Sequence, residues 1–145
     1  IPNVVTVPAT KADVRLGDSI ALLSALAPHE PVDAGRPLVV RLGWRALARP
    51  DADATVFVHL LDSDGKLATQ KDSPPAGGRR PTSWWLPGEL LVDRYDLPTD
   101  SVSPGEYRLQ LGMYDPTTGR RLPLYVDGIR QADDRLLLPE SIIIR

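Results

Sequence analysis

Hydrophobic and polar residues alternate most regularly in two stretches, Leu38–Ala46 and Glu106–Asp115. Successive side chains of a strand point to opposite faces, so this period predicts two strands, each with one face in the core. We expect Trp44 to lie on the buried face of the first. In the second, Arg108 and Gln110 point outward. Its inward-facing residues are Tyr107, Leu109, Leu111 and Met113.

Two further apolar runs have the length of strands. Ile20–Leu26 is confined by Gly17 and Pro28, which favours a strand over the alternative, a helix beginning at Ser19. Ala54–Asp62 is apolar on both faces. The simplest interpretation of the second run is a strand covered on both sides.

Turn signals connect these runs to their neighbours. Asp64-Gly65 is a preferred two-residue turn, with positive φ at both residues, and returns the chain into Lys66–Lys71. The sequence Asp115-Pro-Thr-Thr-Gly119 is a second turn, after which we expect Arg120–Val126 to return as a hairpin partner of the preceding strand. Asp72–Pro81 contains three prolines and two adjacent glycines, and is expected to be an irregular surface loop that Thr82–Leu86 continues.

Shorter strands complete the expected fold. They are placed at Asp13–Asp18, at Glu89–Leu97 near a sheet edge, and in a closing strand of Leu136–Leu138 and Ser141–Ile144 interrupted by Pro139.

The run Val102–Tyr107, with Pro-Gly-Glu before the tyrosine, is typical of the corner of an immunoglobulin-like fold, where a tyrosine hydroxyl bonds back to the backbone. Fifteen prolines and eleven glycines argue against a helical bundle. We therefore predict an all-β fold, an immunoglobulin-like antiparallel β-sandwich forming one domain over residues 1–145. Residues 1–12 are expected to be an extended lead-in, able to link the domain to a preceding membrane segment.

Charge and composition limit the classes of partner that the domain could bind. A net charge of −2 and a pI of about 5.6 provide no broad positive field for nucleic acid. No apolar run approaches the ~20 residues that span a bilayer, so direct membrane insertion is not expected. The chain does not begin with Met, and its only methionine is Met113, so we expect it to be part of a larger protein.

The sequence holds no recognisable catalytic or metal-binding motif. Cysteine is absent, and neither His29 nor His59 belongs to a G-x-S-x-G or H-E-x-x-H pattern. Asp62-x-Asp64-Gly65 is interpreted as a turn rather than a calcium loop, and Asp133-Asp134 as a solvated loop. We expect no cofactor, no metal and no enzymatic activity.

One cluster carries a binding hypothesis: Arg79, Arg80, Trp84 and Trp85. Adjacent residues of an extended segment point to opposite sides, so one indole can enter the core while the other remains exposed. An exposed indole beside arginines could stack on a sugar ring or contact a protein partner. The hypothesis assigns the binding role to Trp85, and we expect its replacement by alanine to leave folding intact but to abolish glycan binding. The alternative is that the loop only covers one end of the sandwich.

Residues 54–125, from FVHLLDSDGK through SPGEYRLQLGMYDPTTGRRLPL, resemble the C-terminal soluble domain of bacterial multi-spanning membrane proteins similar to family 39 glycosyltransferases of the dolichyl-phosphate-mannose type. The resemblance consists of turn and strand signatures and includes no catalytic motif. It implies a non-catalytic, extracytoplasmic accessory or interaction domain, tethered to the membrane through a larger protein, whose partner is a glycan or the membrane part of that protein.

Two other functions remain open from the sequence. The first is a carbohydrate-binding module that uses an exposed Trp84 or Trp85. The second is a hydrolase, which would need two carboxylates about 5–10 Å apart in one cleft.

Overall fold

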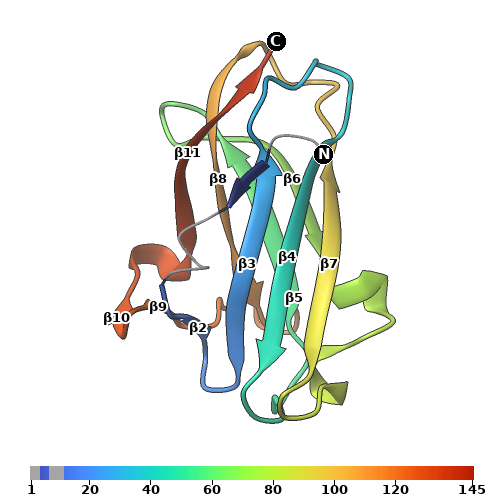
Figure 1. Cartoon of the computed structure of the whole chain (residues 1–145), viewed down its shortest axis with the longest axis vertical. Helices are drawn as coiled ribbons and strands as arrows, with labels where there is room; N and C mark the ends of the chain where they lie inside the picture. Colours follow the sequence, from blue (N-terminus) through green and yellow to red (C-terminus); the bar gives the residue numbers. More distant parts are fainter. Residues whose placement is uncertain (1–3, 7–11) are drawn as a thin grey trace.

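The computed structural model describes residues 4–6 and 12–145, whose backbone forms two antiparallel β-sheets packed as a sandwich (Figure 1). The strand order in the first sheet is β10-β9-β2-β3-β4-β7, and β1 also pairs with β3. Its strands are β1 (Val4–Thr6), β2 (Val14–Leu16), β3 (Ile20–Pro28), β4 (Leu38–Ala46), β7 (Leu90–Leu97), β9 (Leu124–Val126) and β10 (Ile129–Arg130).

The second sheet has the order β11-β8-β5-β6. Its strands are β5 (Thr55–Leu61), β6 (Leu67–Ser73), β8 (Gly105–Tyr114) and β11 (Leu136–Ile144). The predicted all-β sandwich is confirmed. Of the expected lead-in, β1 pairs with β3, and residues 1–3 and 7–11 lie outside the described residues. Among those described, no helix has the length and apolar character needed to cross a membrane.

The core lies between the inner faces of the two sheets, as the alternating runs predict. Trp44 on β4 is fully buried, opposite Leu22 of β3 and Leu91 of β7. The four inward residues predicted for β8 are all buried as well. The expected strand at Ile20–Leu26 is confirmed as β3, and the predicted edge strand as β7, the last strand of its sheet. Alternation is a local signal that burial of one face enforces, so it identified these strands correctly.

The tyrosine corner is also present. The Tyr107 hydroxyl donates a hydrogen bond to the backbone carbonyl of Ser103 at 2.5 Å, and the ring is buried. This bond fixes the loop that enters β8, because the donor and acceptor lie on either side of the turn.

The prediction that Arg120–Val126 returns beside β8 is wrong beyond Leu122. The segment begins as a hairpin, with Leu122 N donating to the carbonyl of Met113 at 2.8 Å. Pro123 has no N–H to continue the ladder. The chain then crosses to the other sheet, where Gly17 N donates to the Pro123 carbonyl and β9 pairs with β2.

The β5–β6 connection is a hairpin, as predicted, but not through a two-residue turn. Only Gly65 has a positive φ, of 79°, whereas Asp64 does not. The Asp62 carboxylate accepts hydrogen bonds from the backbone N–H groups of Asp64 and Lys66, both at 2.9 Å. This side-chain bonding stabilises a longer turn, which the Asp-Gly signal alone did not distinguish.

The loop predicted at Asp72–Pro81 starts later than expected, since β6 continues to Ser73 and Pro75–Gly78 forms a 3-10 turn. A second 3-10 turn occupies Thr82–Trp84, where the sequence indicated an extended segment. Both turns lie beside β7, at the opposite edge of the sandwich from β9 and β10 (Figure 1).

Candidate functional site

The four residues proposed from the sequence, Arg79, Arg80, Trp84 and Trp85, do not form one exposed cluster, because some are buried or paired and others are exposed. Trp85 is only 1% exposed, and its indole N–H donates to the Arg80 carbonyl at 3.0 Å. The Arg80 guanidinium forms an ion pair with Glu89 and holds the pKa of that carboxyl below its usual range. Arg80 and Trp85 therefore fasten the loop to the sandwich, and the expectation that Trp85 carries a ligand is corrected: its ring cannot present a face to solvent.

Trp84 is the exposed member of the pair, with 57% of its surface accessible. Arg79 is also exposed, and its Nε donates to the Ala76 carbonyl at 3.1 Å. A binding role for these two residues stays a prediction.

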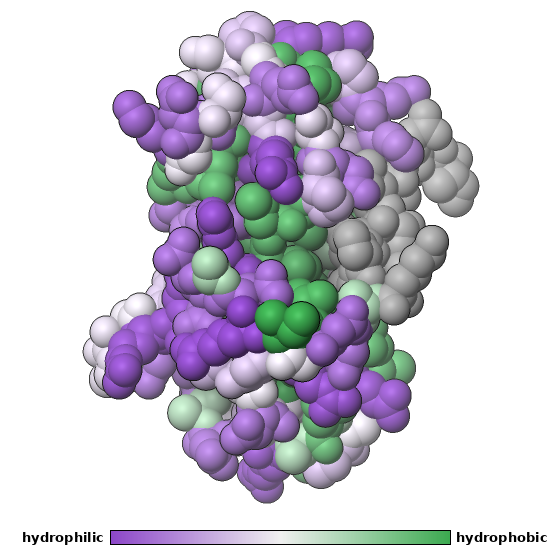
Figure 2. Space-filling model, turned by 90° about the vertical axis from the view of Figure 1, so that its left-hand side faces the viewer, coloured by the Kyte–Doolittle hydropathy of each residue, from purple (hydrophilic) through white to green (hydrophobic). Residues whose placement is uncertain are grey.

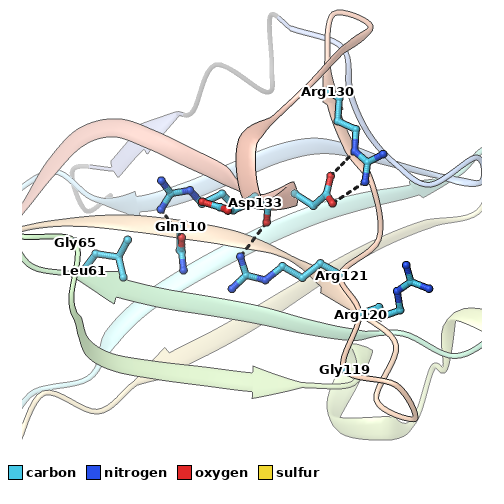
Figure 3. A pocket seen from close by; sticks show the side chains of 10 residues that line it. Leu61, Gly65, Gln110, Gly119, Arg120, Arg121, Arg130 and Asp133 are labelled. Atoms are coloured by element: carbon cyan, nitrogen blue, oxygen red, sulfur yellow. Dashed lines mark hydrogen bonds and ion pairs between the residues drawn. The ribbon is translucent and has the colours of Figure 1, made fainter.

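A cleft lies elsewhere, on the outer face of the second sheet. Its volume is about 590 Å³ and it is open to solvent. Strands β5 and β8, the β5–β6 turn and the segment 119–135 contribute to it. Figure 3 shows the Arg121 side chain extending toward Gln110, whereas Arg120 points away from both. Its lining residues are Leu61, Gly65, Gln110, Gly119, Arg120, Arg121, Arg130, Asp133, Asp134 and Arg135. The side of the molecule with β9, β10 and β11 carries many hydrophilic residues around a strip of hydrophobic ones (Figure 2).

The segment 119–135 covers part of this outer face and gives the cleft a wall. Phe57 of β5 points outward from the sandwich core yet is buried, because the Arg121 guanidinium lies 4.3 Å from the centre of its ring. Gly112 of β8 lies directly against this ring and close to the Asp134 carbonyl. The prediction that Ala54–Asp62 is covered on both sides is thus confirmed. The segment after β8 covers its outer face.

A hydrogen-bonded chain of side chains forms the floor. Arg135 donates to the Gln110 side-chain oxygen at 2.8 Å, so the Gln110 amide nitrogen faces His59 Nδ1 at 3.0 Å and donates to it. His59 Nδ1 is then the acceptor nitrogen, and Nε2 carries the proton that is donated to Asp72 at 3.2 Å. Tyr114 donates to the other oxygen of Asp72 at 3.1 Å. This order requires a neutral imidazole and fixes the orientation of Gln110, which is buried although it points outward as predicted.

We expect the protonation of His59 to destabilise the domain. Burial lowers the pKa of the imidazole below its ordinary value of 6.5, and Asp72 opposes this effect without cancelling it. The unfolded chain therefore takes up the proton at a higher pH than the folded protein. The stabilisation is present above about pH 6.5 and is lost as the pH falls through the lower pKa of the folded state.

Chemical unfolding between about pH 7.5 and 5 would measure this loss, with His59→Gln as the comparison. The free energy of unfolding should fall more steeply in the unmodified protein. Parallel curves for the two proteins would show that His59 contributes no such dependence.

A second cleft of about 390 Å³ adjoins the first and shares Leu61, Gly65 and Arg135 with it. It continues toward Tyr107 and Ser141, along β8 and β11. The two together form an elongated depression that is polar in the first cleft and mostly apolar in the second. Its residues are far apart in sequence and match no spaced motif. The only signals in the sequence were the outward Gln110 and the four arginines between positions 120 and 135.

One acidic group of the cleft, Asp134, is unsuited to the general-acid role in a hydrolase. Arg130 donates two hydrogen bonds to Asp134, and this guanidinium holds the pKa of the carboxyl below its usual range, which opposes a general-acid role. The Asp133-Asp134 stretch is thus not wholly solvated, because Asp134 is engaged. Within residues 4–6 and 12–145, no three histidine, aspartate or glutamate side chains are grouped to hold a metal ion.

Comparison with solved structures finds an all-β domain of the same kind. The crystal structure of the C-terminal domain of Wzt matches 93% of this chain and 78% of that chain, with a TM-score of 0.64 and 14% sequence identity. At this identity the likeness shows a shared fold. No protein-family model and no curated protein sequence matches the chain.

Proposed function

We propose that this chain is a non-catalytic carbohydrate-binding domain, and that it binds its ligand in the elongated depression on the outer face of the second sheet. The observation that carries the proposal is the pair of adjoining clefts, of which the first is polar and contains two oriented planar side chains, Gln110 and Arg135. Sites for polar ligands combine a concave surface with a few fixed hydrogen-bonding groups, and amide and guanidinium groups suit sugar hydroxyls.

The likeness to the C-terminal domain of Wzt supports this choice. It is a likeness of fold, at 14% sequence identity. The depression is also longer than one compact pocket, which favours an extended saccharide chain as the ligand.

The exposed indole of Trp84 supports a second binding position for the same function. A flat aromatic face in solvent can stack on a sugar ring. The 3-10 turn that ends at Trp84 lies beside β7, at the other edge of the sandwich from β9 and β10 (Figure 1), so the two positions are separable by mutation.

Attachment to a membrane glycosyltransferase-like protein and an extracytoplasmic location are further parts of the proposal. They rest on the sequence resemblance of residues 54–125 and on the alternating turn signals there. A carbohydrate-binding domain is compatible with such a setting, because it could hold the acceptor glycan near the membrane part.

A glycan array of bacterial cell-surface oligosaccharides tests the function, using the unmodified domain, Gln110→Met and Trp84→Ala. We expect at least one oligosaccharide to bind, and Gln110→Met to weaken it at least about tenfold, because the replacement keeps the volume but removes both amide contacts. Thermal unfolding of each variant shows whether it is folded.

Binding lost in Trp84→Ala and retained in Gln110→Met would overturn the cleft as the binding position in favour of the indole. The absence of binding to every oligosaccharide would overturn the proposed function itself.

A further inference from the structure

Four arginines and two aspartates line the first cleft, and only one of the arginines is neutralised by a carboxylate. Arg130 donates two hydrogen bonds of 2.9 Å to Asp134, in a forked pair that uses both carboxylate oxygens. Among the described residues, the other three guanidiniums, those of Arg120, Arg121 and Arg135, have no carboxylate within ion-pair distance.

Two of these three guanidiniums are held in place by neutral groups. Arg121 donates to the backbone carbonyl of Asp133 at 2.9 Å and lies over the Phe57 ring. Arg135 donates to the Gln110 side-chain oxygen, whose orientation is fixed from below by His59. Each arginine has five N–H donors, so most remain available after these contacts.

The local charge is opposite in sign to that of the whole protein. The chain carries a net charge of −2, whereas the cleft has an excess of positive side chains. Some other exposed arginines of this protein are paired with acids, for example Arg15 with Asp13 and Arg94 with Asp96, whereas others, such as Arg41 and Arg45, are paired with no acid in the described part of the chain. An unneutralised group of cations, positioned before any ligand arrives, is an arrangement that favours a negatively charged ligand.

We propose that this cleft selects saccharides that carry a carboxylate or a phosphate group, with Arg121 and Arg135 binding the anionic oxygens and Gln110 binding an adjacent sugar hydroxyl. The planar fork of arginine matches both anions, which share two or more oxygens in one plane of approach. This inference rests on the proposed glycan-binding function and specifies the class of glycan.

The test compares glucose, glucuronate and a glucose phosphate, together with inorganic phosphate as an anion without a sugar. Each is titrated into the isotopically labelled domain while NMR follows the Gln110 side-chain amide and the arginine Nε–H signals. We expect both charged sugars to bind at least about tenfold more tightly than glucose, because each would form charge-assisted hydrogen bonds. Their affinity should also fall as NaCl is raised from about 50 to 500 mM.

The matched variants are Arg121→Gln with Arg135→Gln, and Arg41→Gln with Arg45→Gln. The second pair changes the net charge equally, but lies on the exposed face of β4 in the other sheet. The first pair should remove the preference for charged sugars, and the second should preserve it. A preference for glucuronate or for the glucose phosphate identifies which anion the site favours.

The outcomes separate this inference from the broader function. Equal binding of glucose and the charged sugars would overturn the anion preference and leave the glycan-binding function standing. A preference that survives in the first pair of variants would also overturn it. Binding of inorganic phosphate at these signals, with no sugar bound, would support the anion site and remove the glycan role.

Discussion

Replacing Trp85 with alanine should destabilise the domain by about 3–5 kcal/mol, the usual cost of removing a large buried aromatic side chain. The ring is fully buried, and its N–H satisfies the Arg80 carbonyl, which would lose its hydrogen bond. Denaturant unfolding followed by far-UV circular dichroism measures the change without relying on the tryptophan signal itself. Trp85→Phe, which keeps most of the ring volume, should lose less and remain folded if the alanine variant does not.

Trp84→Ala is the control for this prediction. The two residues are adjacent and identical in type, but Trp84 is 57% exposed, so its removal should change the free energy of unfolding by no more than about 0.5 kcal/mol. Comparable losses in the two variants would contradict the assignment of one indole to the core and the other to the surface.

This pair of tryptophans shows what local sequence patterns can predict and what they cannot. The rule that adjacent residues point to opposite sides correctly predicted one buried and one exposed indole. It could not say which was which, because burial of Trp85 depends on how the 3-10 turn at Thr82–Trp84 approaches the sandwich. That approach is fixed by contacts such as the ion pair of Arg80 with Glu89.

The core strands were predictable because their pattern depends on local sequence and not on contacts with distant segments. In β4 and β8 every second residue is apolar, and the physical cause, one face against the other sheet, acts within a single strand. The course of the chain after β8 was not predictable in the same way. A hairpin was a reasonable expectation from the turn at 115–119, but Pro123 ends the pairing and β9 finds its partner, β2, more than a hundred residues earlier.

The candidate cleft was the feature hardest to predict from the sequence, since its residues come from β5, β8 and the segment 119–135. The arginines at 120, 121, 130 and 135 are visible in the sequence, yet their spacing matches no known ligand pattern. Only the crossing of the chain over the outer face of the second sheet brings them beside Gln110. Prediction of such a site requires the topology, and the topology predicted after Leu122 was wrong.

Gly112 links this crossing to the stability of the fold. A methyl group added there would lie 2.7 and 2.8 Å from two carbon atoms of the Phe57 ring and 3.2 Å from the Asp134 carbonyl oxygen. The ring cannot move outward freely, because the Arg121 guanidinium lies over it. Gly112→Ala should therefore destabilise the domain by about 1–3 kcal/mol, as overpacking does in a filled site. It should also weaken binding of the charged sugars, because the displaced ring pushes on an arginine of the cleft wall.

Gly105→Ala tests whether the effect is specific to this contact. Gly105 belongs to the same strand, but an added methyl there meets nothing closer than 3.6 Å, so unfolding should change by no more than about 0.5 kcal/mol. Adding Phe57→Leu to Gly112→Ala should restore part of the loss, since a smaller side chain vacates the space, and the two changes should be non-additive by about 0.5–3 kcal/mol. If unfolding measurements instead gave additive effects, the clash between position 112 and the Phe57 ring would not be the cause, and the close packing of β8 beneath the cleft wall would need another explanation.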